Sequence, residues 1–321
     1  VYVVLNNITT GAAMFSPNGE FMGFYGANRV QPTAEIIGDY VSGIFMSEEK
    51  RARRTRNVPT GITSFDIEGD FIYTCTSSST QTTDTVKKLN AAGKNIFAGN
   101  ENIFGDYSPM YDTSQNRVLA SAIVDIDIAE DGNINCLDLT MGRIFQYDED
   151  CNLLFIVGTN ASQVGGFRQA AALESCGDRL YVTDTMKNTV TIFKETDFGE
   201  VVHKASTLHN GGYYEEALNP WLEVLKYDGT YRRAYLGIAA AKLRSGEYEE
   251  AMKYAKLADA GKIYDKAFEG YRLEFIRNNF EPILLALIFA AIAIAGTLKI
   301  RKDKKAALAA EKNKEKSEEK E

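Results

Sequence analysis

The chain has 321 residues, of which 45% are hydrophobic, a length that fits about two domains with buried cores. Its formal net charge of −8 argues against a general nucleic-acid binder, which would normally be basic. The four cysteines are Cys75, Cys136, Cys151 and Cys176, with no C-x-x-C pair among them. Zinc or redox spacing is therefore absent, and we expect small buried thiols. Their even number leaves disulfides open in an oxidising compartment.

The sequence begins inside an alternating, strand-like run from Val1 to Val4, with no initiator methionine and no signal peptide before it. We therefore expect an N-terminally incomplete chain. A second run, Ala12 to Phe15, leads into Asn18-Gly19, which is a hairpin-turn signal. These runs predict the first of several short antiparallel strands.

One pattern occurs twice between residues 123 and 193. Each copy has a polar turn with a glycine (Gly132 or Gly177), an alternating strand, a short loop and a second alternating strand. The first strands end at Asp138 and Asp184, which lie 46 residues apart. A period of about 40–50 residues built from short strands is typical of β-propeller blades. Blades stack around a central axis because one sheet alone cannot bury both of its faces.

A weaker copy runs from Gly69 to Thr76, with Thr76 where the other copies have aspartate, and continues through residues 86–96. About four blades are therefore visible, at roughly 1–30, 60–100, 120–160 and 165–205. We predict a mainly β chain whose residues 1–204 form a propeller. Closed propellers usually have more blades, so about two are expected to precede Val1.

Two insertions interrupt the predicted blades. Residues 31–58 contain an amphipathic stretch, and residues 98–119 form a polar loop; blade insertions often lie on the binding face. The first insertion ends in a basic cluster that could contact anionic lipid or acidic polymer, although Glu48 and Glu49 beside it favour a solvated helix end. This cluster comprises Lys50, Arg51, Arg53, Arg54 and Arg56.

The hydrophobic period changes from 2 to 3.6 after Lys204. A Gly-x-Tyr-x-x-Ala pattern then occurs twice, 34 residues apart, which is the length of a tetratricopeptide repeat. Its members are Gly212, Tyr214 and Ala217, then Gly246, Tyr248 and Ala251. We predict tetratricopeptide-like helices over 205–278, with alanine at the helix crossings and Trp221 in the packing rather than on a ligand platform. About one and a half repeats fit, so this part should lean on the propeller or on a partner.

Residues 282–298 carry no charge, and nine of them are leucine, isoleucine or phenylalanine. These side chains contribute about −3 to −5 kcal/mol to membrane insertion. We predict a transmembrane helix at 281–300 that contacts the bilayer through 282–298, followed by a charged tail at 301–321. Positive charge gathers just after the span, which places the tail in the cytoplasm and the rest of the chain outside. The charges are Lys299, Arg301, Lys302, Lys304 and Lys305.

Residues 123–205 resemble NHL-repeat propellers, whose blades read Asp-Gly-Asn-Ile-Tyr-Val-Thr-Asp and then Asn-x-Arg-Ile-x-x-Phe. The match is good from Gly177 to Phe193, with Thr189 in place of the arginine. The whole chain resembles bacterial membrane-anchored NHL-propeller proteins with tetratricopeptide repeats. Some are called gluconolactonase-like, and some are linked to Yip-family membrane domains. The resemblance implies an architecture and says little about a ligand.

Few residues indicate chemistry. Asp138 and Asp184 recur alike in both copies, which favours a structural role as strand-end acceptors of backbone N–H groups. A lactonase-like enzyme would need carboxylate and asparagine ligands around one divalent ion at the propeller axis. The candidates Asp66, Asp125, Asp127 and Asn135 form no spaced motif.

The only histidines are His203 and His209, for which a hydrogen-bonded or solvent-facing role is expected. Nucleophile-elbow and phosphate-loop motifs are absent, so we assign no catalytic, cofactor or metal residue. The sequence favours a membrane-anchored, extracytoplasmic recognition module that binds a protein, peptide or glycan. The alternatives are a metal-dependent lactonase-like hydrolase and an accessory subunit of a membrane transport complex.

Overall fold

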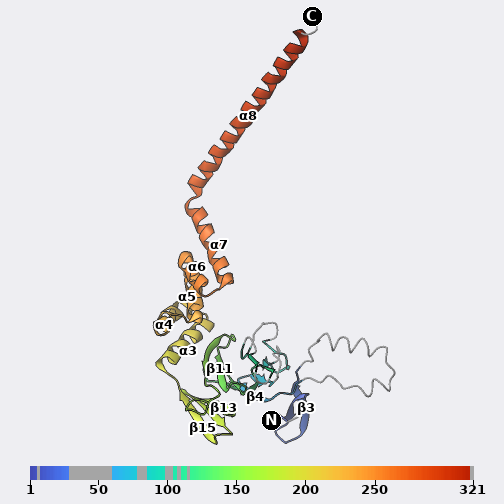
Figure 1. Cartoon of the computed structure of the whole chain (residues 1–321), viewed down its shortest axis with the longest axis vertical. Coiled ribbons are helices and arrows are strands. Elements are labelled where there is room, and N and C mark those ends of the chain that lie inside the picture. Colours follow the sequence, from blue (N-terminus) through green and yellow to red (C-terminus); the bar gives the residue numbers. More distant parts are fainter. Residues whose placement is uncertain are drawn as a thin grey trace, which may run out of the picture. The chain divides into compact units, whose positions relative to one another are not determined.

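The computed structural model describes residues 1–5, 8–28, 60–77, 85–97, 104–106, 110–113 and 116–318. The predicted insertion at 31–58, with its basic cluster, lies outside these residues. The chain divides into two compact units, Val1–Tyr227 and Asp228–Glu321. Figure 1 shows strands in the first part of the sequence and helices in the rest.

Among the described residues, the first unit contains four antiparallel sheets of three or four strands in chain order. The first sheet comprises β1 (Tyr2–Val3), β2 (Gly11–Phe15) and β3 (Phe21–Gly26), and the second comprises β4 (Ser64–Glu68), β5 (Phe71–Cys75) and β6 (Val86–Leu89). The third comprises β9 (Ile123–Ile128), β10 (Ile134–Asp138), β11 (Arg143–Tyr147) and β12 (Leu153–Val157). The fourth comprises β13 (Ala170–Cys176), β14 (Arg179–Asp184) and β15 (Thr189–Lys194). A two-stranded hairpin, β7 (Met110–Asp112) and β8 (Arg117–Leu119), lies in the segment that we predicted as a loop.

The four sheets fall in the four stretches predicted from the repeats, but their strand numbers differ from the expected four. Among the described residues, only the β9–β12 sheet has four strands, and the others have three. In the β13–β15 sheet the reason is local. The chain enters a helix at Asp197, directly after β15, so no fourth strand follows.

Neighbouring sheets are joined through their first strands in one repeated register. Asp66 on β4 accepts a hydrogen bond from the backbone N–H of Ile128 on β9 (2.7 Å). Asp127 on β9 accepts one from Ser175 on β13 (2.9 Å). Asp66 lies opposite Tyr73, and Asp127 lies opposite Asn135, so the two carboxylates hold equivalent positions. The equivalent residue in the next sheet is therefore Glu174, opposite Tyr181, and it is exposed.

Apolar side chains fill the spaces between these sheets. Val86, Cys136 and Phe145 belong to a buried cluster shared by the β4–β6 and β9–β12 sheets. Leu137, Ile144 and Val182 belong to a second cluster, shared by the β9–β12 and β13–β15 sheets. Successive residues of one strand thus pack in different interfaces, because side chains alternate between the two faces of a sheet.

Six helices follow the sheets: α3 (Asp197–Asn210), α4 (Tyr214–Tyr227), α5 (Arg232–Arg244), α6 (Tyr248–Leu257), α7 (Gly261–Asn278) and α8 (Phe280–Glu318). The helical part begins at Asp197 rather than at residue 205, because the Thr196 hydroxyl caps α3 by accepting the N–H of Gly199 (3.2 Å). The described residues contain more helix than strand. The expected class of mainly β therefore does not hold for the whole chain, largely because of the 39 residues of α8.

The Gly-x-Tyr-x-x-Ala residues lie at the turn and in the second helix of two helical hairpins, α3–α4 and α5–α6. Gly212 and Gly246 have φ angles of +82° and +81° between the paired helices. Ala217 and Ala251 are fully buried. Tyr214 packs edge-on against His209, with ring centroids 5.0 Å apart. The Tyr248 ring lies against Gly270 of α7, where a Cβ would come within 2.4 Å of it.

Replacing Ala251 by leucine should lower the free energy of unfolding by about 1–3 kcal/mol, because the larger side chain overpacks a fully buried site in the α5–α6 hairpin. Ala217→Leu should behave alike in α3–α4. Thermal unfolding checks this, with the exposed Lys253→Leu as the matched control on α6. Unchanged stability in both alanine variants would show that these residues do not lie at close helix crossings.

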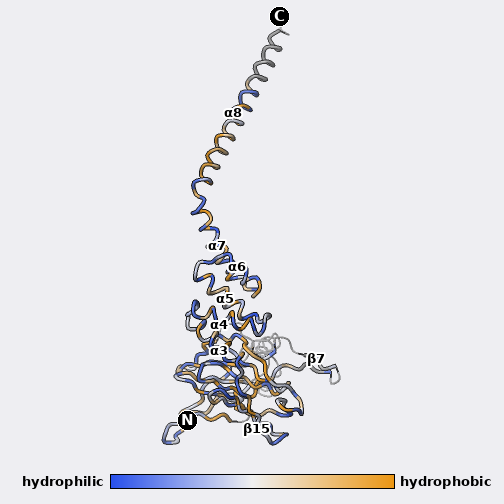
Figure 2. The backbone as a smooth tube through the Cα atoms, turned by 90° about the vertical axis from the view of Figure 1, so that its left-hand side faces the viewer, coloured by the Kyte–Doolittle hydropathy of each residue, from blue (hydrophilic) through white to orange (hydrophobic). Residues whose placement is uncertain are grey.

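Among the described residues, one helix is long and apolar enough to cross a membrane, over Phe280–Ala306 in α8. None of its most apolar window is buried inside the protein. Figure 2 shows the hydrophobic run in α8 with hydrophilic residues beyond it. This helix includes the predicted span at 281–300 and is consistent with single-pass anchoring.

Candidate binding site

A cleft of about 480 Å³ lies between the β9–β12 and β13–β15 sheets, beside the first turns of α3. Ile144 projects into it from β11, and Phe155 and Val157 project from β12. Positions 155 and 157 share one face of their strand because side chains alternate. The remaining apolar walls are Leu180, Phe193 and Phe198. Apolar side chains from both sheets and from α3 therefore line the cleft.

His203 of α3 supplies the polar end of the cleft. Its Nε2 lies 2.6 Å from Oε1 of Gln146, and its Nδ1 lies 2.5 Å from Oε1 of Glu195. Asp131 is farther away, with its Oδ2 at 3.9 Å from Nδ1. The Phe155 ring meets the imidazole edge-on, with centroids 5.7 Å apart. His203 is thus hydrogen-bonded, as the sequence led us to expect.

A chain of buried amides sets the direction of the hydrogen bond to His203. Asn135 donates from Nδ2 to the Asp127 carboxylate (2.8 Å), which can only accept when ionised. The Oδ1 of Asn135 then accepts from Nε2 of Gln146 (2.8 Å). This leaves Oε1 of Gln146 as an acceptor, so Nε2 of His203 must donate to it. The Glu195 carboxylate beside Nδ1 is an acceptor as well, so both ring nitrogens face acceptor oxygens.

This arrangement orients His203 but leaves it poorly suited to general-base catalysis. A general base needs an unprotonated nitrogen within reach of a substrate proton, and here both nitrogens face acceptors. The carboxylates of Asp178 and Glu195 also lie at the edge of the cleft, where Asp178 is 3.6 Å from Arg179 and 3.7 Å from Lys194. The site can therefore position a ligand by shape, apolar contact and a charged rim.

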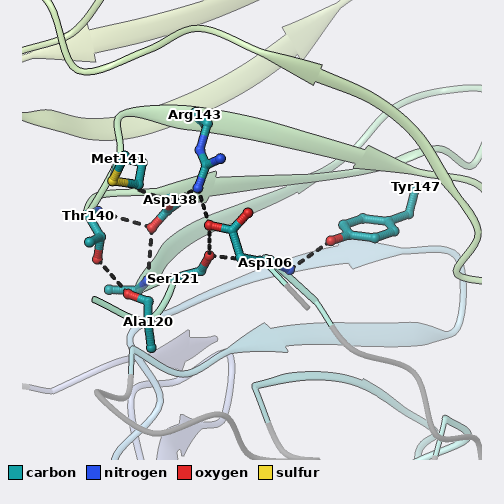
Figure 3. A network of polar contacts seen from close by, with 10 residues as sticks. Asp106, Ala120, Ser121, Asp138, Thr140, Met141, Arg143 and Tyr147 are labelled. Carbon is teal, nitrogen blue, oxygen red and sulfur yellow. Dashed lines mark hydrogen bonds and ion pairs between the residues drawn. The ribbon is translucent and has the colours of Figure 1, made fainter. Parts of the chain in front are cut away.

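The strand-end aspartates lie outside this cleft and bind backbone. Asp138 accepts hydrogen bonds from the N–H groups of Ala122 (2.8 Å), Thr140 (3.0 Å) and Met141 (3.3 Å) (Figure 3). Arg143 lies 3.6 Å away and also binds Asp106. Burial raises the pKa of Asp138, against the opposing effect of these N–H groups and Arg143.

Asp184 has the same role in the next sheet. It accepts N–H groups from Arg168 (2.6 Å), Gln169 (3.3 Å), Met186 (3.0 Å) and Lys187 (3.0 Å). Burial acts to raise its pKa, but the four hydrogen bonds outweigh burial and lower it. Gly132 and Gly177 lie in the turns before β10 and β14, with φ angles of +83° and +56°.

The carboxylates proposed as axial metal candidates converge but are engaged with backbone. Asp66 and Asp127 bind N–H groups of the next sheet, and Asp125 accepts the N–H of Leu173 (2.7 Å). These three carboxylates lie near Glu174. Burial raises the pKa of Glu174, and charge repulsion from Asp127, Asp66 and Asp125 raises it further. In the described part of the chain, no group of three His, Cys, Asp or Glu side chains is placed to hold a metal ion.

Sequence reasoning did not find the cleft. Phe155, Phe193 and Phe198 come from three different elements, and only the packing of two sheets and a helix brings them together. Phe193 belongs to the recognised repeat, but the repeat does not show that its side chain borders a space. The sequence around Gln146 contains no motif that indicates its role. That role depends on hydrogen bonds to Asn135 and His203, which lie on other elements.

Comparison with known proteins adds little. No protein-family model matches the chain, and no curated protein matches it. Among solved structures, one similar chain is a catalytically inactive virginiamycin B lyase from Staphylococcus aureus with quinupristin. The identity is 8%, the alignment covers 61% of this chain and 73% of that chain, and the TM-score is 0.26. A TM-score this low supports no transfer of ligand or activity.

Proposed function

We propose that this chain is a membrane-anchored recognition module that binds a protein, peptide or glycan in the cleft between the β9–β12 and β13–β15 sheets. The cleft itself carries the proposal. It is open, apolar on its walls and bordered by an oriented histidine at one end, a composition typical of binding sites held on a rigid scaffold. The apolar helix α8 supplies the membrane anchor.

The proposal includes a specific architecture. The sheets would be blades of an NHL-type β-propeller, and the two glycine-turn hairpins would be tetratricopeptide-like. The repeated carboxylate register of Asp66 and Asp127 supports the first assignment, as do the matching hydrogen bonds of Asp138 and Asp184. The left-handed Gly246 between α5 and α6 supports the second.

Of the two alternatives, no observation favours the metal-dependent hydrolase, since Asp66, Asp125 and Asp127 bind backbone N–H groups. A role as accessory subunit of a membrane complex is compatible with the same cleft, whose ligand would then be another subunit. In both cases the ligand would bind to the apolar walls of the cleft.

Arrays of peptides and of oligosaccharides, presented to the full-length protein in lipid nanodiscs, test the proposed function. A ligand of the cleft should bind at least about tenfold more weakly to the double variant Phe155→Ala, Phe198→Ala, because two aromatic contacts are lost. Phe24→Ala, an equally aromatic but remote exposed site, is the control. If every bound ligand is indifferent to the double variant, or none binds, the cleft is not a recognition site.

The side of the membrane is a separate prediction. We propose that the sheets and helical hairpins are extracytoplasmic, because five positive charges follow the span. The thiol of Cys176 is free and exposed, so a membrane-impermeant maleimide should label it in intact cells. Cys176→Ser should abolish the signal. Adding Ser317→Cys to that variant should restore labelling only after the cells are opened. The reverse pattern would place the tail outside.

A further inference from the structure

The two sheets that border the cleft differ by one strand. Asp138 and Asp184 end equivalent strands, so β11 corresponds to β15. The outer edge of β11 pairs with β12, with Ile144 opposite Val157 and Gln146 opposite Phe155. The corresponding edge of β15 pairs with no strand in the part of the chain that the structure describes. The cleft lies beside this edge.

The backbone of β15 shows which hydrogen-bonding groups are directed outward. Glu195 donates its N–H to the carbonyl of Asp178, at the β14 side (2.8 Å). Direction alternates along an antiparallel strand, so Thr191 and Phe193 also face β14, and Val190, Ile192 and Lys194 face away from it. In the neighbouring sheet, Asp148 corresponds to Lys194, and its N–H binds the carbonyl of Asn152 (3.0 Å). An unpaired row of this kind is a template for another strand.

The side chains around this edge suit a strand rather than a compact ligand. A strand beside β15 would direct every second side chain between Phe155 and Val157 on one wall and Leu180 and Phe193 on the other. The intervening side chains would lie on the opposite face, beside Val190 and Ile192, which are 58% and 53% exposed. Apolar surface is therefore available on both faces of the position that β12 fills in the neighbouring sheet.

We propose that the ligand of the cleft is an extended peptide segment with apolar residues, which adds to the β13–β15 sheet as a fourth, antiparallel strand beside β15. This rests on the proposed function and narrows it to one ligand class. Main-chain hydrogen bonds to Val190 and Ile192 would supply affinity, and the alternate pockets would supply specificity. A glycan could use the apolar walls, but it has no main chain whose N–H and C=O groups repeat in register with those of β15.

The protein's own fourth strand supplies the probe. A synthetic peptide with the sequence of residues 152–158, flanked by lysines for solubility, is titrated against the full-length protein in nanodiscs. By analogy with the β11–β12 ladder, the N–H groups at peptide positions 155 and 157 should point towards β15, and those at 154 and 156 should point away. Methylating the first pair of nitrogens should weaken binding at least about tenfold, whereas methylating the second pair should leave most of the affinity.

A variant of the protein tests the same hydrogen bond from the other side. Ile192→Pro removes an outward N–H without taking a donor from the β14–β15 ladder, and proline is tolerated on such edges. It should weaken the peptide at least about tenfold, while Ile192→Thr, which keeps the N–H, should change affinity by less than about threefold. Thermal unfolding of both variants checks that the sheet is intact, and the methylated peptides decide the question if Ile192→Pro fails to fold.

The outcomes separate this inference from the function on which it rests. Equal affinity for the two methylated peptides, lost in Phe155→Ala, Phe198→Ala, would leave the cleft as a side-chain site and overturn strand addition. Strand addition is also overturned if the peptide does not bind while an oligosaccharide does, or if two copies of the protein associate through this edge. If neither the methyl groups nor the double variant changes the affinity, the proposal that the cleft is the binding site is overturned as well.

Discussion

Asp127→Ala is expected to lower the free energy of unfolding by about 3 kcal/mol, since it leaves buried donors without their acceptor. The Asp127 side chain is 3% exposed. It accepts the N–H of Ser175 at 2.9 Å and Nδ2 of Asn135 at 2.8 Å. The first bond joins two sheets, and the second begins the amide chain that orients His203. Urea unfolding, followed through the fluorescence of the single tryptophan, Trp221, measures the change.

The chain contains its own control for this substitution. Glu174 holds the position in the β13–β15 sheet that Asp127 holds in the β9–β12 sheet, but it is exposed. Glu174→Ala should therefore change the free energy of unfolding by less than about 0.5 kcal/mol. Equal losses at both positions, or no loss at Asp127, would mean that the repeated register does not hold the sheets together.

The double variant Ile288→Lys, Ile292→Lys should release the protein from the membrane. Both positions lie in the middle of the apolar run of α8. Each change costs about 3–4 kcal/mol on the insertion scale, because a favourable isoleucine is replaced by a charged side chain. Together they exceed the roughly −3 to −5 kcal/mol that the large apolar side chains of the span contribute. Alkaline extraction followed by sedimentation should move the protein from the pellet to the supernatant.

Position is the control for the membrane prediction. Ile300→Lys adds the same charge at the end of the span, next to Lys299 and Arg301, where a lysine can reach the interface. This variant should stay in the membrane fraction. A double variant that resists extraction, or an unaltered protein that is soluble without detergent, would show that α8 does not insert.

Local patterns carried most of what could be predicted. The alternating strands before Asp138 and Asp184 were readable because their side chains repeat every second residue, and each carboxylate binds N–H groups in the adjoining turns. Gly212 and Gly246 could also be predicted from the local sequence, because each adopts the left-handed conformation of one turn. Structural features that depend on only a few consecutive residues can therefore be predicted from the sequence.

The parts that were missed depend on which elements become neighbours. The start of α3 at Asp197 was missed because the Thr196 cap follows closely after β15, whose sequence resembles that of its counterpart β11 in the preceding sheet. The cleft was missed because it lies where the β13–β15 sheet, in the part of the chain that the structure describes, has no fourth strand. Phe155 and Val157 of another sheet border this place. No local sequence motif predicts that a sheet has an unpaired edge.

Amide hydrogen exchange at single-residue resolution tests most directly whether a peptide strand binds at the outer edge of β15. The full-length protein in nanodiscs is compared with and without the peptide of residues 152–158. The N–H groups of Val190 and Ile192 should exchange at least about tenfold more slowly in the complex, because each gains a partner. Thr191, which already faces β14, should change little. Unchanged exchange at Val190 and Ile192 under saturating peptide would contradict a strand-binding edge.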